Sequence, residues 1–193
     1  MALRRIIYPD NPVLRKKARR VREFDRELHM LLDDMAQTMQ QADGVGLAAP
    51  QVEVSQRAIV VRLPDGEEWA EKYGEEAGKL YEVVNPEIIK KSREMVDGVE
   101  ACLSIPGYFG TVERHEAVTI RGQDRDGETI RIKARDWLAR VFQHEIDHLD
   151  GVLYTDIATE IWKADEEPPG ARENGDRSSP SAVEVSATGD TAD

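Results

Sequence analysis

The nine residues QHEIDHLDG, from Gln143 to Gly151, form the stretch of this chain with the clearest chemical meaning. Residues four apart on a helix lie on one face, with about 5–6 Å between their Cβ atoms, so His144 and His148 can bind one metal ion. Glu145 follows the first histidine, where its carboxylate can approach a water at that ion without being a ligand. The simpler alternative is two partly buried histidines on an amphipathic helix, but the glutamate between them favours metal-assisted hydrolysis.

A catalytic metal of this kind usually has about three protein ligands and one open position. The longer pattern HExxHxxGxxH takes its third histidine from its end; Gly151 fits that pattern, but Tyr154 stands at the last position. Two glutamates further downstream, Glu167 and Glu173, fall in a segment that we expect to be unstructured. The remaining candidate is Cys102, the single cysteine, within EACLSIPG. A lone cysteine is more often a small buried hydrophobe, so its role depends on the surrounding motif.

The composition is that of a soluble globular protein, with 193 residues, 40% hydrophobic and 33% charged. The net charge of −12 argues against a nucleic-acid-binding surface, which needs a basic patch. A single cysteine excludes an intrachain disulfide, which fits a reducing compartment. The N-terminus has no apolar run typical of a signal peptide, and no stretch approaches the ~20 apolar residues of a membrane span. We therefore expect a cytoplasmic protein without membrane or nucleic-acid partners.

Two regions of different composition divide the chain. Residues 1–163 are predicted to form one catalytic domain. Residues 164–193 contain eight acidic and two basic side chains, a net charge of −6, and are rich in Pro, Gly and Ser. Such a composition buries too little apolar surface to offset the entropy of ordering, so this acidic tail is predicted to be disordered.

The sequence predicts two helices. One spans residues 25–42 with Asp25 as its N-cap, because apolar residues recur at helical spacing. The other spans residues 137–149 and carries HEIDH, with Asp136 as a candidate cap and Gly151 as a C-terminal stop. The apolar stripe of the first helix consists of Phe24, Leu28, Leu31, Met35 and Met39.

Runs of β-branched residues predict strands between the helices. Asp126-Gly127 indicates a hairpin between the last two of them. Residues 64–78 are expected to form a charged loop or at most a short helix, and residues 152–157 a last extended piece. The predicted strands are residues 57–63, 80–85, 87–95, 111–113, 117–122 and 129–134. This order predicts an α+β domain, with antiparallel strands packed around a C-terminal metal-binding HExxH helix and an N-terminal amphipathic helix.

A third segment, GVGLAAPQ, follows the first helix. Gly44 and Gly46 permit close approach of the backbone. A phosphate-binding loop would need the wider GxGxxG context between a strand and a helix, which is absent. Gln51, at the end of this segment, can point its amide into a site.

Together, GVGLAAPQ, EACLSIPG and QHEIDHLDG resemble the three motifs of the peptide deformylase family, GxGLAAPQ, EGCLS and QHExDHLxG, in the same order. Members of that family remove the N-formyl group from the initiator methionine of new bacterial and organellar proteins. The resemblance spans roughly Leu3 to Asp156. It implies a metal-dependent amide hydrolase that acts on N-formylmethionyl nascent peptides, releases formate and contacts the ribosome transiently.

The resemblance also implies roles for particular residues. Glu145 is the general base and then the general acid. The side-chain amide of Gln51 and the backbone N–H of Leu103 stabilise the oxyanion, and the backbone of Gly46 binds the peptide. The metal ligands implied are Cys102, His144 and His148. The candidates for the methionine pocket, from the flanks of the motifs, are Val45, Leu138 and Val141.

The donor set suits several divalent ions. Thiolate and imidazole ligands fit Fe(II), Zn, Ni and Co, and the resemblance favours Fe(II) in cells. One position departs from the family's pattern, because Ala101 replaces the usual glycine before the cysteine. If that position needs a positive φ, alanine strains the backbone by roughly 1 kcal/mol or more.

Two rival functions stay open at this stage. An HExxH metallopeptidase shares Glu145 but takes a third ligand other than Cys102. A deformylase-like protein that binds metal or peptide without turnover is expected if Ala101 compromises the site. A purely structural zinc site is less favoured, because Glu145 stands beside an expected open coordination position.

Overall fold

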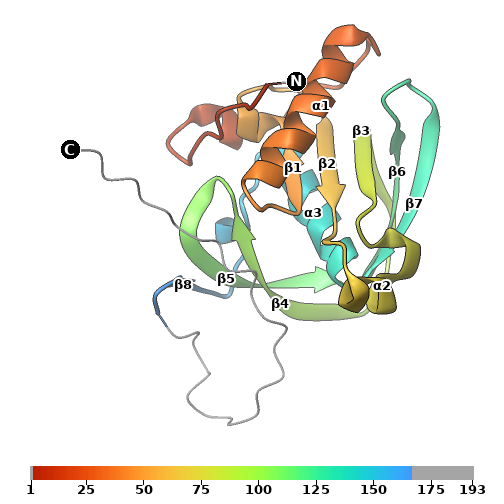
Figure 1. Ribbon diagram of the computed structural model, residues 1–193. Helices are drawn as coiled ribbons and strands as arrows, with labels where there is room; N and C mark the ends of the chain where they lie inside the picture. The colour runs from red at the N-terminus through yellow and green to blue at the C-terminus, as the bar shows by residue number, and fades with distance from the viewer. Residues whose placement is uncertain (1, 167–193) are drawn as a thin grey trace.

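The computed structural model describes residues 2–166, and in this part of the chain two antiparallel sheets combine with three α-helices in an α+β arrangement (Figure 1). The helices are α1 (Arg26–Gln41), α2 (Glu67–Tyr73) and α3 (Asp136–Asp150). The five-stranded sheet has the order β1 (Gly46–Ala48), β2 (Ala58–Arg62), β3 (Leu80–Lys91), β6 (Ala117–Gln123) and β7 (Thr129–Arg135). The three-stranded sheet has the order β4 (Met95–Cys102), β5 (Ile105–His115) and β8 (Glu160–Lys163).

Both faces of the five-stranded sheet are covered near β2, with α1 on one face and α3 on the other (Figure 1). Ile59 and Val61 pack in the core cluster that contains α3, whereas Ala58 and Val60 pack in the cluster that contains α1. Side chains alternate between the two faces of a strand, so a strand covered on both faces must be apolar throughout. This explains the continuous apolar run of β2.

The first helix confirms the sequence prediction almost to the residue. The Asp25 carboxylate accepts a hydrogen bond from the backbone N–H of Leu28 at 3.0 Å and so caps α1. Four members of the predicted stripe are buried: Leu28, Leu31, Met35 and Met39. The fifth, Phe24, is partly buried and packs against the same cluster.

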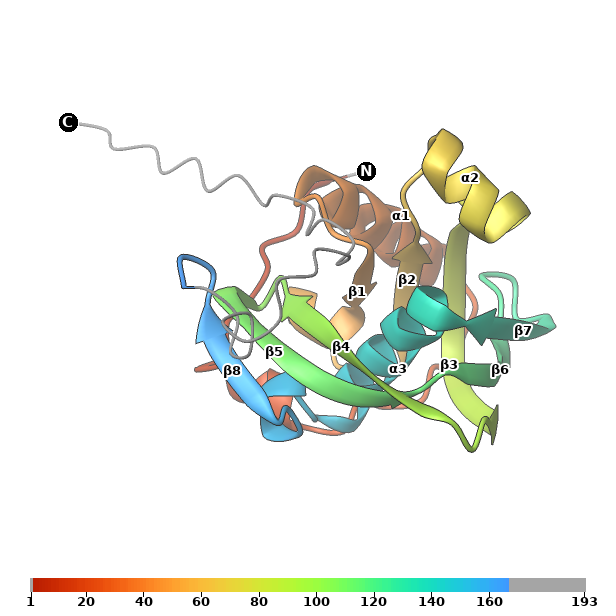
Figure 2. The ribbon, with the colours of Figure 1, turned by 90° about the horizontal axis from the view of Figure 1, so that it is seen from below.

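The second predicted helix is α3, which packs on β1, β2 and β7 of one sheet and on β5 of the other (Figure 2). Gly151 ends it with a left-handed φ of 79°, as expected. The expected cap was wrong, because Arg135 occupies the N-cap position and no side chain caps this end. Asp136 is the first helical residue, and its N–H donates to the carbonyl of Glu116 at 2.9 Å.

The strand predictions were wrong in several places. The two strands predicted on either side of Pro86 are one strand, β3, whose pairing with β6 shifts register between Val84 and Glu87. An irregularity of this kind accommodates a proline, which cannot donate to the ladder. Residues 154–156 form a 3-10 turn in place of the expected extended piece. Residues 64–78 contain the short helix α2, which agrees with the prediction of a charged loop or at most a short helix.

The largest difference is the long ribbon of β4 and β5, of which only fragments were predicted. Its register runs from Met95 opposite His115 to Cys102 opposite Ile105, so Cys102 lies at the tip of the ribbon. Strand β8, which pairs with β5, was not predicted at all. Of the predicted acidic tail, only the first three residues are described, so its disorder stays a prediction.

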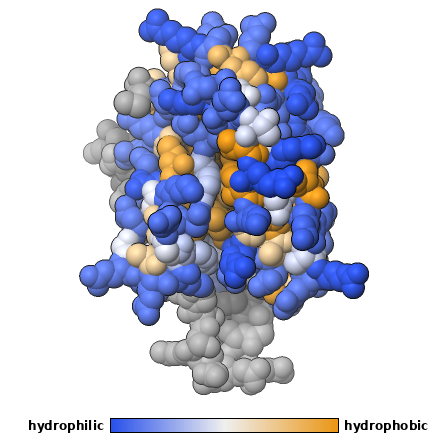
Figure 3. Space-filling view, turned by 90° about the vertical axis from the view of Figure 1, so that its right-hand side faces the viewer, coloured by the Kyte–Doolittle hydropathy of each residue, from blue (hydrophilic) through white to orange (hydrophobic). Residues whose placement is uncertain are grey.

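The surface is mostly polar around a band of apolar side chains on the face shown in Figure 3. Among residues 2–166, no α-helix combines the length and apolar character that crossing a membrane requires.

Candidate metal centre

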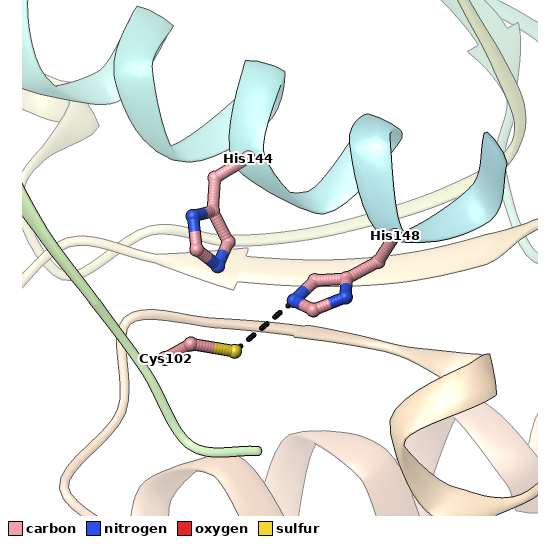
Figure 4. A group of neighbouring side chains, drawn as sticks. All are labelled: Cys102, His144 and His148. Atoms are coloured by element: carbon pink, nitrogen blue, oxygen red, sulfur yellow. Dashed lines mark hydrogen bonds between the residues drawn. The ribbon is translucent and has the colours of Figure 1, made fainter. Parts of the chain in front are cut away.

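Three side chains from two elements converge on one point (Figure 4). Cys102 comes from the end of β4, while His144 and His148 project from one face of α3. One donor atom from each, the sulfur and two ring nitrogens, lie within 4.8 Å of one another, and all three residues are buried. The Cys102 Sγ is 3.2 Å from the His148 Nε2, and the two imidazole centroids are 5.0 Å apart. We call these three residues the Cys-His-His cluster.

The orientation of His144 is fixed from two sides. Its Nδ1 lies 2.9 Å from the Glu100 Oε2, so a proton on Nδ1 is donated to that carboxylate and Nε2 is left to face the cluster. The ring of Tyr154 stacks on the imidazole at a centroid distance of 6.0 Å. A carboxylate behind a histidine ligand is the usual device that sets its tautomer and ring orientation.

Glu100 is held in turn by two guanidinium groups. Arg114, from β5, donates through Nε to Oε1 at 2.8 Å and through Nη2 to Oε2 at 3.0 Å. Arg140, from α3, donates to Oε1 at 3.0 Å. Burial alone would raise the pKa of Glu100, but hydrogen bonds and charges from His144 and Arg114 outweigh it and lower the pKa to about 2. Glu100 is therefore a carboxylate.

Glu145 lies beside the cluster and is only 4% exposed. Its Oε1 packs against Gly46, where a Cβ would come within 2.3 Å of that oxygen. Its Oε2 has no hydrogen-bond partner among the described residues. Burial is the main cause that raises the pKa of Glu145 to about 7, against the charge of His144. A buried acceptor without a partner next to three convergent donor atoms is suited to exchange a proton with a water or substrate at that point.

Of the two residues expected to stabilise an oxyanion, Gln51 points its side chain at the cluster and Leu103 points its side chain away from it. Gln51 is 1% exposed; its Oε1 accepts from the N–H of Ala48 at 2.8 Å, so its amide NH₂ faces the cluster. The Nε2 lies 3.5 Å from the Cys102 Sγ and 3.2 Å from the Ser104 Oγ. Leu103 directly follows Cys102, and its side chain packs away, against the core beneath α1.

The residues expected to form the methionine pocket are all part of, or packed against, the core cluster that contains α3. Leu138 and Val141 are 2% and 6% exposed. They precede Glu145 by seven and four residues on α3, which places them on the same side of the helix. Val45 is partly buried, and its carbonyl accepts from the N–H of Arg62 at 2.9 Å. Their role in binding a substrate stays a prediction.

Ala101 carries no backbone strain of the kind considered from the sequence. It lies in β4 with an exposed side chain, and it is not among the non-glycine residues with a positive φ. The non-glycine residues with a positive φ in the described part are Asp43, Glu53, Asn85 and Asp136. Ala101 is therefore an exposed residue of β4, at the point where the pairing with β5 shifts register between Glu100 and Cys102.

Glu100, Arg114, Arg140 and Tyr154 were not predicted from the sequence as residues of the site. Glu100 stands two residues before Cys102 in the same motif, and Arg140 four residues before His144 on the same helix. These spacings were the available signals, because residues two apart on a strand and four apart on a helix share a face.

The donor set fits a divalent transition metal. One thiolate and two imidazoles make three protein ligands, the number that a catalytic zinc-type site uses while it keeps a fourth coordination position open. Glu145, whose Oε2 has no partner among the described residues, directly follows His144 in the sequence. The downstream glutamates considered as alternative ligands, Glu167 and Glu173, lie outside the described residues.

Comparison with known proteins identifies relatives along almost the whole described chain. The sequence model of the family described as polypeptide deformylase matches residues 3–163. A peptide deformylase of Symbiobacterium thermophilum is 48% identical over 167 residues, covering 86% of this chain and 72% of the relative. Another, from Alkaliphilus metalliredigens, is 47% identical over 156 residues, covering 81% of this chain and 97% of the relative.

Solved structures agree with the sequence relatives. The peptide deformylase of Thermotoga maritima superposes with a TM-score of 0.74 at 38% identity, covering 83% of this chain and all of the other. A class I type b peptide deformylase of Acinetobacter baumannii, bound to Met-Ala-Ser, gives a TM-score of 0.72 at 34% identity, covering 80% and 98% of the two chains.

Proposed function

This chain belongs to the peptide deformylase family, and from that premise we propose how its residues remove the formyl group from the N-terminus of nascent polypeptides. Enzymes of this family are metal-dependent hydrolases, and the chain contains a candidate donor set for the metal. The observation that carries the proposal is the convergence of the Cys-His-His cluster beside a buried carboxylate with a free oxygen, on Glu145.

Cys102, His144 and His148 hold the metal in this proposal. When bound, a divalent ion supplies Lewis acidity, which lowers the pKa of water and polarises a carbonyl oxygen. Fe(II) is the proposed ion in cells, and Zn, Ni and Co also fit the donor set. The hydrogen bond from His144 to Glu100 keeps the ring in the tautomer that can bind a metal through Nε2.

Glu145 moves the proton. Its carboxylate accepts a proton from the attacking water and delivers it to the amine of the leaving methionine, so that formate and a free N-terminus result. The packing of Oε1 against Gly46 holds this carboxylate in place, and Oε2 stays available for the proton.

Gln51 and Leu103 stabilise the negative charge that develops on the formyl oxygen. The Gln51 amide is preorganised, because its oxygen is already bound by the N–H of Ala48 and its nitrogen points to Cys102. The backbone N–H of Leu103 adds a second donor beside the sulfur. Fixed donors of this kind act without reorganising during the reaction.

The substrate peptide is proposed to lie along the edge of β1. This strand pairs only with β2 in its sheet, so its other edge, at Gly46, can offer backbone hydrogen bonds to an extended peptide. The Acinetobacter baumannii relative is bound to Met-Ala-Ser, a peptide that begins with methionine. In this chain we assign the methionine side chain to Val45, Leu138 and Val141.

The cellular setting follows from the substrate. We propose that the enzyme acts in the cytoplasm on nascent chains, with transient ribosome contact and without binding nucleic acid or membranes. The net charge of −12 offers no overall attraction to RNA.

Formate release from N-formyl-Met-Ala-Ser tests the proposal. Protein loaded anaerobically with Fe(II), and in parallel with Ni(II), is expected to release formate at a rate that Glu145→Ala lowers by at least about 10²-fold, because general acid–base catalysis contributes about that much. Metal content is measured on both proteins. Equal rates of formate release from the parent and from Glu145→Ala, both loaded with the same metal, would show that Glu145 is not the proton-transfer group.

A further inference from the structure

Arg140 is a buried charged residue to which the proposed reaction assigns no role. It lies on α3 one turn before His144, and it is only 7% exposed. Its Nη1 donates to the carbonyl of Val112 at 2.7 Å and to the carboxylate of Glu100 at 3.0 Å, and its Nη2 donates to the carbonyl of Val96 at 2.8 Å. One guanidinium from α3 therefore reaches both β4 and β5.

The guanidinium lies directly on Gly98 of β4. A Cβ on Gly98 would come within 2.6 Å of Cζ and Nη2 and within 2.7 Å of Nε. Nη1 also approaches the carbonyl of Gly98 at 3.3 Å. No larger residue leaves room for the guanidinium at this distance, so the glycine and the arginine form one unit. Gly98 does not have a positive φ, so close approach is the reason for a glycine here.

This unit bridges the two halves of the Cys-His-His cluster. Cys102 is carried by β4, an edge strand of the three-stranded sheet that pairs only with β5. His144 and His148 are carried by α3, which packs largely on the other sheet. The relative position of the sulfur and the imidazoles therefore depends on the contacts that join β4 to α3.

Glu100 makes the coupling direct. Its Oε1 accepts from Arg140, and its Oε2 accepts from the Nδ1 of His144. Arg140 thus fixes the same carboxylate that orients a metal ligand, and it also holds the strand that carries the other ligand. A planar guanidinium suits this geometry, because its several donors are spread over a rigid fork, whereas an ammonium group is a compact point charge.

We propose that Arg140, seated on Gly98, is a positioning residue that sets the distance between the sulfur on β4 and the imidazoles on α3 and so tunes metal affinity. The inference rests on the proposed ligand set. It differs from a purely structural role, because it concerns the folded protein's affinity for metal rather than its stability alone.

Two substitutions disturb the unit from opposite sides. Arg140→Met removes the donors and keeps an apolar stem of similar length. Gly98→Ala keeps every donor and acceptor, but it pushes the guanidinium by nearly 1 Å, if a contact of about 3.5 Å is to be restored. Residues that orient metal ligands typically change metal affinity by about 10–100-fold when they are mutated. We expect a rise of that size in the Kd for Co(II) in both variants.

Arg125→Met is the control. Arg125 also donates to more than one element, to the carboxylate of Asp33 on α1 and to that of Glu82 on β3, and neither element carries a member of the Cys-His-His cluster. Its loss is expected to lower the unfolding temperature and to leave the Kd for Co(II) within about twofold of the parent, which is within a few tenths of a kcal/mol.

The measurement is a Co(II) titration against a competing chelator, read from the thiolate-to-cobalt absorption band, on proteins shown by circular dichroism to be folded without metal. A weaker Kd and a shifted band in Gly98→Ala and Arg140→Met, with Arg125→Met like the parent, support the inference. In the double variant Gly98→Ala/Arg140→Met, the alanine is expected to add no further loss, because the group it displaces is gone.

Parent-like Kd values and bands in folded Gly98→Ala would overturn the inference, even if Arg140→Met fails to fold. An equal loss in Arg125→Met would also overturn it, because the effect would then be general. Cys102→Ala distinguishes a wrong ligand set from a wrong positioning role for Arg140. If it retains the parent's affinity, the ligand set itself is wrong and both proposals fall; if it loses affinity while Gly98→Ala does not, only the positioning role is refuted.

Discussion

Gly46→Ala is expected to lower turnover by about 10²-fold while leaving the fold and the metal content intact. The backbone at Gly46 does not have a positive φ, so alanine is allowed there by conformation. The obstacle is Glu145, because the added Cβ would lie 2.3 Å from Oε1, 2.8 Å from Cδ and 2.9 Å from Cγ. Restoring an ordinary contact of about 3.5 Å requires the carboxylate to move by about 1 Å.

A displacement of about 1 Å at a reacting group can cost about 10²-fold in rate, which corresponds to about 2.7 kcal/mol in the activation free energy. The loss is expected in kcat rather than in KM, since Gly46→Ala retains the backbone groups that bind the peptide and displaces the proton-transfer group. Gly74→Ala is the control: Gly74 has a φ of 58° with no atom within 4 Å of an added Cβ, so strain is the only expected effect. Parent-like kcat in metal-loaded Gly46→Ala would refute the placement of Glu145.

Three further outcomes are expected. Glu100→Ala leaves His144 without its partner and two guanidinium groups without their carboxylate. We therefore expect a loss of about 3–5 kcal/mol in the free energy of unfolding, measured by urea unfolding of the metal-free protein, and a rise of about 10–100-fold in the Kd for metal, measured by chelator competition. An unchanged Kd would contradict the role of Glu100. Asp25→Ala removes the cap of α1 and is expected to cost about 0.5–2 kcal/mol by urea unfolding without changing kcat, whereas a change in kcat would show that α1 reaches the site. Metal removal is expected to lower stability by about 2.7 kcal/mol relative to a free metal concentration 100 times Kd, and an unfolding temperature that does not depend on metal concentration would speak against a site formed only in the folded state.

The helices could be predicted from the sequence because their signals are local. In α1 the apolar spacing, the Asp25 cap and the buried face all match the helix predicted from the sequence. In α3 the local signals were the HExxH spacing and Gly151, which ends the helix. The cap of α3 was not predictable, because Asp136 bonds a distant carbonyl, that of Glu116.

The β4–β5 ribbon was missed because its glycines suggest turns. Gly98 and Gly110 are each explained by a side chain that packs directly on the strand: Arg140 on the first, and Tyr154 on the second, where an added Cβ would lie 2.9 Å from Cε2. These glycines mark close approach between elements distant in sequence. Local patterns carry no information about such contacts, so a strand containing them looks interrupted.

The candidate site likewise contains some residues that could be predicted from the sequence and others that could not. The candidate metal donors were predictable, because His144 and His148 stand four residues apart on a helix and Cys102 is the single cysteine, in a motif that resembles one of the family. The residues behind them were not, since Glu100 meets His144, Arg114 and Arg140 only after α3 has packed against the ribbon. The methionine pocket could be predicted only as candidates, because Leu138 and Val141 are also ordinary members of the core.

X-ray absorption at the zinc edge tests the central claim, the ligand set, most directly. Zinc-loaded protein is expected to show one sulfur at about 2.3 Å and two imidazole nitrogens at about 2.0–2.1 Å. The sulfur shell is expected to vanish in Cys102→Ala, with both nitrogens kept. A parent spectrum with only nitrogen and oxygen ligands, or a sulfur shell that survives in Cys102→Ala, would contradict the assignment of Cys102, His144 and His148 as the metal ligands.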